Sequence, residues 1–120
     1  MATEYKEKRR YPRYPCDTGV RVRPEKTSAG YWGTLSDISL GGCYVYTFSP
    51  LAVGQMVTLV VKINDAEVDV AGKVVSTHPG VGMGVAFAGF VHQDGEEQLK
   101  GYLSQLAAQP RPKDTVAVFH

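Results

Sequence analysis

The stretch MVTLVVKINDAEVDVAGKVVS, residues 56–76, decides the fold class of this chain. In its first part every second side chain is apolar, the period of a β-strand with one buried face: Val57, Leu59, Val61 and Ile63. Asn64 and Asp65 then supply a turn, and the alternation resumes at Val68, Val70 and Val74. The stretch therefore predicts a β-hairpin, in which Gly72 marks a bulge or a bend.

Four further strands are expected on either side of this hairpin. They lie between runs of Gly, Pro, Ser and Asp, at spacings typical of a small all-β barrel or sandwich: 18–24, 30–37, 42–48 and 81–88. The last of them contains VGMGVAF, in which one face is apolar through Val81, Met83, Val85 and Phe87. Gly82, Gly84 and Ala86 leave the other face almost bare, which indicates close approach of backbone, another element or a ligand.

One helix follows the strands. Asp94 stands three residues before Glu97, as in a capping box, and apolar residues then recur at helical spacing: Leu99, Tyr102, Leu103 and Leu106. The helix is expected to pack these apolar residues against the barrel and to end near Gln109, before Pro110. No structure is assigned to the tail, residues 110–120.

Length and composition predict one soluble domain in a reducing, cytoplasmic compartment. The chain has 120 residues, no apolar leader and no apolar run of about 20 residues that could span a membrane. Two isolated cysteines, Cys16 and Cys43, are too few for a disulfide framework or a zinc cluster.

Catalytic signals are absent from the sequence. His78, His92 and His120 stand apart, and neither a catalytic triad nor a metal site can be assembled from them. With no phosphate loop and no pairing of a nucleophile with a base, we expect a protein that is not an enzyme and has no metal or cofactor.

Basic charge gathers at the N-terminus. The net charge is only +1, yet the first 26 residues hold 8 of the 13 Lys and Arg. Within EKRRYPRYPCD, residues 7–17, Arg9 and Arg13 are four positions apart, with Lys8 and Arg10 beside them. A guanidinium can bond phosphate or a guanine edge in a bidentate fork and stack on a flat ring. The stretch predicts an extended arm that grips an anion, although a solvated basic terminus is an alternative.

A second motif, LSDISLGG, contains D-x-S-x-x-G at Asp37, Ser39 and Gly42, between two predicted strands. Asp37 and Ser39 are two apart on an extended chain, so we expect them to project from one face and offer a carboxylate and a hydroxyl together. Gly41 and Gly42 permit the positive φ of a tight turn and close backbone approach. The alternative is an ordinary Asx or Ser turn capped by glycine.

Together, RRYPR and DISLGG resemble the two signatures of the PilZ domain family, R-x-x-x-R followed by [DN]-x-S-x-x-G. Only Arg9 and Arg13 stand in the required register, because the residue four after Arg10 is Tyr14. The GMGVAF strand is similar to the Gly-Val-x-Phe strand of these domains. The resemblance covers about residues 7–106.

The resemblance implies a six-stranded antiparallel (split) β-barrel with a C-terminal helix that binds cyclic di-GMP (c-di-GMP), a bacterial second messenger. Arg9 and Arg13 would hold phosphates and guanines, with Arg10 and Lys8 as possible further contacts. Asp37 and Ser39 would read a guanine edge, while Gly42, with Gly41 beside it, would keep the turn open.

In this interpretation the N-terminal arm, residues 1–16, folds over the barrel, residues 17–90, when the ligand arrives. The helix, 91–109, and the tail, 110–120, complete the chain. Having room for one domain, the protein would act in trans on a protein partner, as a monomer or a ligand-dependent homodimer.

Two other classes stay open. One is an adaptor of PilZ fold that binds a protein partner with little or no nucleotide. The other is a small barrel that binds RNA or single-stranded DNA. The placement of the basic residues argues against this class, because they concentrate at one end and are not interleaved with aromatics across several strands.

Overall fold

The hairpin expected from residues 56–76 is formed by strands β4 (Met56–Ile63) and β5 (Ala66–His78) in the computed structural model, which describes residues 11–27 and 29–108. Asn64 and Asp65 have φ of 49° and 71°, the left-handed conformations of a tight two-residue turn. The β5–β6 register shifts between Ala71 and Gly72, where Ala88 of β6 is the extra residue, so the bulge predicted at Gly72 lies in the strand opposite it. A Cβ at Gly72 would lie 2.6 Å from the Val85 side chain, so a glycine is needed there.

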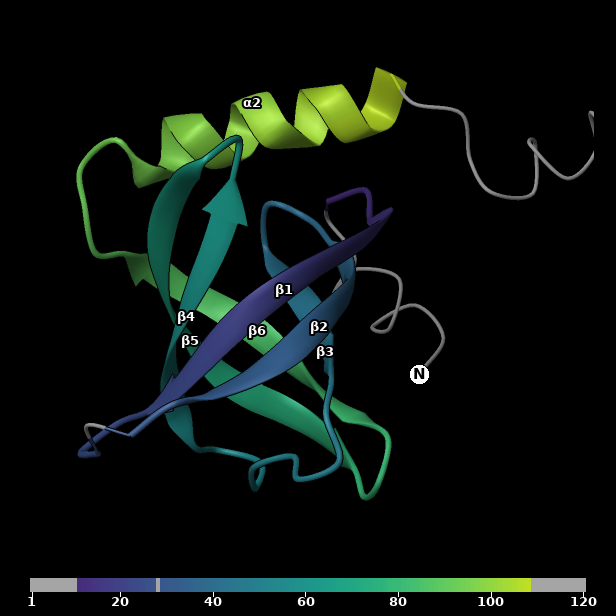
Figure 1. Ribbon diagram of the computed structural model, residues 1–120, viewed down its shortest axis with the longest axis vertical. Coiled ribbons are helices and arrows are strands. Elements are labelled where there is room, and N and C mark those ends of the chain that lie inside the picture. Colours follow the sequence, from purple (N-terminus) through teal and green to yellow (C-terminus); the bar gives the residue numbers. More distant parts are fainter. Residues whose placement is uncertain (1–10, 28, 109–120) are drawn as a thin grey trace, which may run out of the picture.

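Six antiparallel strands close into a barrel in the order β1-β2-β3-β6-β5-β4, with β4 pairing back onto β1 (Figure 1). The other four strands are β1 (Tyr14–Pro24), β2 (Tyr31–Ile38), β3 (Gly42–Tyr46) and β6 (Gly82–Phe90). β1 begins before the predicted residue 18, so residues 14–16 of the N-terminal arm are strand. These residues are part of the strand because they pair with β2, Tyr14 with Ile38 and Pro15 with Asp37.

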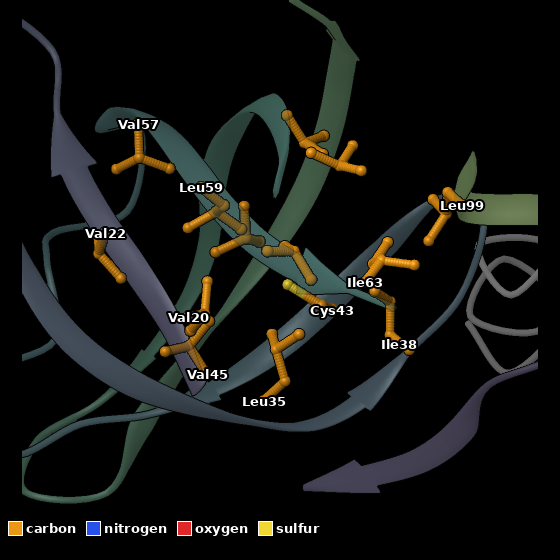
Figure 2. Close-up of a cluster of buried hydrophobic side chains, with 14 of the residues drawn as sticks. Val20, Val22, Leu35, Ile38, Cys43, Val45, Val57, Leu59, Ile63 and Leu99 are labelled. Carbon is orange, nitrogen blue, oxygen red and sulfur yellow. The ribbon is translucent and has the colours of Figure 1, made fainter. Parts of the chain in front are cut away.

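The core fills the barrel interior with aliphatic side chains from all six strands (Figure 2). Val20, Leu35, Val45, Leu59 and Met83 are fully buried. Alternation holds along β4, where every second residue from Val57 to Ile63 is buried. This periodic burial is why the hydrophobic pattern predicted the strands correctly.

The apolar face predicted for VGMGVAF is correct only in its middle. Met83 and Val85 are buried, but Val81 is 53% exposed because it precedes β6, and Phe87 is only half-buried. The opposite face of β6 lacks side chains at its glycines because the neighbouring strand β3 approaches it closely. A Cβ at Gly82 would collide with the Val45 carbonyl oxygen and would lie 2.7 Å from the Tyr44 ring.

Helix α2 (Gly95–Ala108) covers one end of the barrel, where it contacts β1, β4 and β5 (Figure 1). Leu99 and Leu103 are buried, and Leu99 joins the core cluster (Figure 2). The Tyr102 hydroxyl and the Thr18 hydroxyl are hydrogen-bonded at 3.0 Å, which ties the helix to β1. At the first turn, the Gln98 side-chain amide donates to the Asp94 carboxylate at 3.4 Å. In the part of the chain that the structure describes, no helix is long and apolar enough to cross a membrane.

Several predicted features lie outside the described residues. They are Lys8, Arg9 and Arg10 of the arm, Gln109, and the tail 110–120. Of the basic residues in the arm motif, Arg13 is described, and it is exposed.

We predict that Leu99→Ala lowers the free energy of unfolding by about 2–4 kcal/mol, because it leaves a cavity where α2 meets the core. Urea unfolding followed by circular dichroism measures the change. Ser104→Ala, on the exposed side of the same helix, is the matched control and should change stability by less than about 0.5 kcal/mol. Equal losses in the two variants would contradict the packing of α2 on the barrel.

Candidate functional site

The turn between β2 and β3 is organised by Ser39. Its hydroxyl accepts hydrogen bonds from the backbone N–H of Gly41 and of Gly42, both at 3.1 Å, and donates to the Gly42 carbonyl at 3.2 Å. The Ser39 N–H donates to the same carbonyl at 2.8 Å, and the residue is only 6% exposed. The D-x-S-x-x-G segment is therefore a Ser turn, and the hydroxyl expected to point outward beside Asp37 is used within it.

The two glycines of this turn are needed for space. Positive φ was expected of them, and this expectation is wrong, because positive φ among the described glycines occurs at Gly54 and Gly80. A Cβ at Gly42 would collide with the Val85 carbonyl oxygen of β6. A Cβ at Gly41 would lie 2.8 Å from the Tyr11 ring. Close approach, the other role predicted for these glycines, is what requires them.

A bulge in β2 directs Asp37 outward. Leu35 pairs with the buried Val45, but Asp37 pairs with Tyr44, so Ser36 is the extra residue in the β2–β3 ladder. Without it the two-residue period would place Asp37 on the same face as Leu35, inside the barrel. Asp37 is half-buried, and among the described residues its carboxylate makes no hydrogen bond or ion pair.

Two half-buried or buried thiols lie near Asp37. Burial, and after it the charges of Asp37 and Asp17, raises the pKa of Cys16 to about 11. Burial likewise raises the pKa of Cys43, with Asp37 the next cause. Both cysteines are free and their thiols are protonated at neutral pH. Within residues 11–27 and 29–108, no three His, Cys, Asp or Glu side chains gather where they could hold a metal ion.

The arm and the turn meet at Tyr11. Tyr11 is the central residue of the predicted R-x-x-x-R motif, and its ring lies against Gly41 of the D-x-S-x-x-G segment. Tyr11 is 44% exposed, so the contact is at the surface and not part of the core. Residues about 30 positions apart in the sequence are thus neighbours, as a shared binding site would require.

A hollow of about 400 Å³ continues from this contact toward the helix. Its lining comes from the arm, the β2–β3 turn and α2: Tyr11, Pro12, Tyr14, Leu40, Lys100, Leu103 and Ser104. Tyr14 packs partly on the core, whereas Tyr11 and Pro12 are exposed. Tyr14 and the residues just before β1 therefore face both the turn and the helix.

Aromatic side chains extend the surface beside Asp37 across β3. Tyr44, opposite Asp37, lies with its ring over Gly82 of β6, and its hydroxyl is hydrogen-bonded to Nδ1 of His78 at 2.8 Å. Tyr46 meets Tyr44 edge to face at a centroid distance of 5.7 Å. Burial, then Tyr46 and Asp37, raises the pKa of the Tyr44 phenol, so it is neutral at physiological pH.

Trp32 lies at the other end of β2 from Asp37. It is 72% exposed and its ring covers Gly19 of β1, so it is not a core residue. With Tyr46 and Phe48 it lines an open groove of about 830 Å³. Among the described residues, none of the arm or of the D-x-S-x-x-G turn lines this groove.

The chain is similar to known proteins in sequence and in fold. The sequence model of the PilZ domain matches residues 7–105, which include both motifs. No curated protein matches the chain. The PilZ domain of CeSA from a cellulose-synthesizing bacterium is 18% identical, with a TM-score of 0.61 over 78% of this chain and 97% of that one.

Two similar structures were solved with c-di-GMP. The PilZ domain of YcgR from Escherichia coli is 18% identical, with a TM-score of 0.64 over 82% of this chain and 91% of that one. MrkH of K. pneumonia is 20% identical, with a TM-score of 0.66 over 82% of this chain but only 51% of that one. At these identities the structures show a common fold, and the sequence match over most of the length adds the family. The chain belongs to the PilZ domain family.

Proposed function

We propose that this protein is a non-catalytic receptor for c-di-GMP that signals to a partner protein by reordering its N-terminal arm. The observation that carries the proposal is the contact between Tyr11 and Gly41, because it brings the arm motif onto the D-x-S-x-x-G turn. Membership of a family in which YcgR and MrkH were solved with c-di-GMP supports the choice of ligand.

Each motif residue has a chemical part in this proposal. Arg9 and Arg13 hold the phosphates and stack on or bond the guanines, and Arg10 and Lys8 add positive charge to the same arm. Asp37 accepts from the N1 and N2 hydrogens of a guanine, a role supported by its outward direction and by a carboxylate without a partner among the described residues. Gly41 leaves room for the Tyr11 ring of the arm and Gly42 for the close approach of β6, so in this proposal both glycines shape the turn beside the ligand.

Ser39 acts through the turn in this proposal. Its hydroxyl hydrogen is already donated to Gly42, and two backbone N–H groups occupy its oxygen. A ligand contact would require one of these bonds to be exchanged. Ser39 therefore shapes the surface on which Asp37 reads the base.

Reordering of the arm is the step that a partner senses. Tyr11 and Pro12 lie beside Lys100 and Leu103 of α2 across the small hollow. A ligand that draws Arg13 toward its phosphates moves this segment relative to the helix. The arm and α2 together then form the surface that changes with ligand.

We predict that isothermal titration with c-di-GMP at physiological salt gives saturable binding, whereas GTP and cyclic di-AMP give none. Arg9→Ala and Arg13→Ala should each weaken binding about 10- to 150-fold, because each removes charge-assisted hydrogen bonds. Asp37→Ala should weaken binding and reduce the preference for guanine.

Arg21→Ala is the matched control for these variants. Arg21 is an exposed arginine of β1 outside the arm motif, opposite Trp32 in the ladder, and its loss should leave affinity unchanged. Absence of binding by the wild-type chain would refute the receptor proposal and favour the adaptor of PilZ fold.

Ser39→Ala and Asp37→Ala should distinguish a residue that shapes the turn from a residue that contacts the ligand. Ser39→Ala leaves two partly buried N–H groups without their partner, so we expect it to lower the free energy of unfolding by about 1–3 kcal/mol. Asp37→Ala should change it by less than about 0.5 kcal/mol while still weakening binding. Urea unfolding and titration of both variants measure this, and a stable Ser39→Ala protein would contradict the turn role.

Limited trypsin digestion tests the reordering. Cleavage after Arg9, Arg10 and Arg13 should slow at least about 5-fold when c-di-GMP is present, because an arm held on the barrel is a poorer substrate than a free one. Mass spectrometry of the released peptides gives the rates, with GTP in place of c-di-GMP as the control. Binding without any change in these rates would rule out arm reordering.

A further inference from the structure

Tyr44 occupies a position that neither sequence motif predicted. It follows Gly42 by two residues, alternates with the buried Cys43 and Val45, and so projects from the outer face of β3. Its ladder partner on β2 is Asp37, and its partner on β6 is Gly84. The residue that the proposed function assigns to reading a guanine edge therefore has an aromatic ring beside it on the same face.

Glycines of β6 give this ring its place. The Tyr44 ring passes over Gly82, where a Cβ would lie 2.7 Å from it. At Gly84 a Cβ would lie 2.5 Å from the Ser76 hydroxyl, so this position is also bare. Because these side chains are missing, the ring lies low across the strand while Tyr44 remains partly exposed.

Two contacts hold the ring in position. The Tyr44 hydroxyl is hydrogen-bonded to Nδ1 of His78 at 2.8 Å, and the two rings are 5.8 Å apart. Tyr46 also packs edge to face against the Tyr44 ring. A ring fixed before binding loses little conformational entropy when a flat ligand settles on it.

We propose that Tyr44 is a base-stacking residue of the ligand site and that His78 is the positioning residue that holds it. The inference rests on the proposed function. A guanine whose Watson–Crick edge is read by Asp37 must extend over a neighbouring residue on the same face, and Tyr44 is the aromatic neighbour across the β2–β3 ladder. The site thus extends from the arm and the turn over β3 to the end of β5.

Stacking also complements the arginines. c-di-GMP carries two guanines and two phosphates. Without another contact, the arginines of the arm would have to bind all four groups. An aromatic ring on the barrel binds one base and leaves the arginines of the arm for the other groups. It also favours flat purines in general, which leaves the choice of guanine to Asp37.

The test compares three variants in titrations with c-di-GMP. Tyr44→Leu keeps an apolar cover on β6 but removes the aromatic face, and we expect about 10-fold weaker binding or more. Tyr44→Phe keeps the ring and loses only the bond to His78, so we expect less than about 5-fold weakening. Trp32→Leu is the control, an exposed aromatic at the far end of β2, and should bind as the wild type does.

Proton NMR of the wild-type complex supplies a readout that a structural role would not change. Stacking predicts an upfield shift of one guanine H8 and intermolecular NOEs to the Tyr44 ring protons, both kept in Tyr44→Phe and lost in Tyr44→Leu. These signals decide the question even where Tyr44→Leu lowers the melting temperature.

The outcomes separate the two proposals. Wild-type binding without the H8 shift, or undiminished affinity in Tyr44→Leu, overturns the stacking role and leaves the receptor proposal standing. No binding by the wild-type protein overturns both. Weaker binding in Tyr44→Leu together with loss of the H8 shift supports both.

Discussion

Closure of the barrel through β1 is the constraint on which the rest of this structure depends. β1, the first strand of the sheet order, pairs with β2 along one edge and with β4, the last strand, along the other. A closed sheet leaves no unpaired edge, and its interior takes the apolar side chains of all six strands. Because the arm runs directly into β1, closure also determines where the arm ends.

The start of β1 is where the fold and the proposed site coincide. Tyr14 pairs with Ile38 and Pro15 with Asp37, which brings the preceding residues against the β2–β3 turn. Tyr11 then covers Gly41, and the same segment borders α2. The helix is held to β1 by the bond between Thr18 and Tyr102. Arm, turn and helix are thus connected through a single strand, which gives a ligand at the arm a physical route to the helix.

In the D-x-S-x-x-G segment some residues form the turn and another presents a chemical group. Ser39 and Gly42 shape the turn, one through hydrogen bonds and the other through its missing side chain. The carboxylate of Asp37 is outside that bonding and faces solvent only because Ser36 is an extra residue in the ladder. The Ser-turn interpretation and the ligand interpretation of this motif are therefore compatible, since the turn presents the carboxylate.

Local patterns in the sequence determined the strands of the central hairpin, its turn and the helix, because period and turn chemistry act between near neighbours in the chain. The paired motifs, through their order and spacing, also determined the family. The outward direction of Asp37 and the strand character of residues 14–16 could not be read this way, since each depends on the register with a neighbouring strand. The Ser turn, whose bonds are local, was one of the two interpretations that the sequence left open. Tyr44 could have been noticed as an outward residue from the alternation in CYVY, but its neighbours could not. Only the tertiary structure decided that Tyr11 lies on Gly41 and that Tyr44 lies between Asp37 and His78, because barrel closure sets the register that brings those residues together.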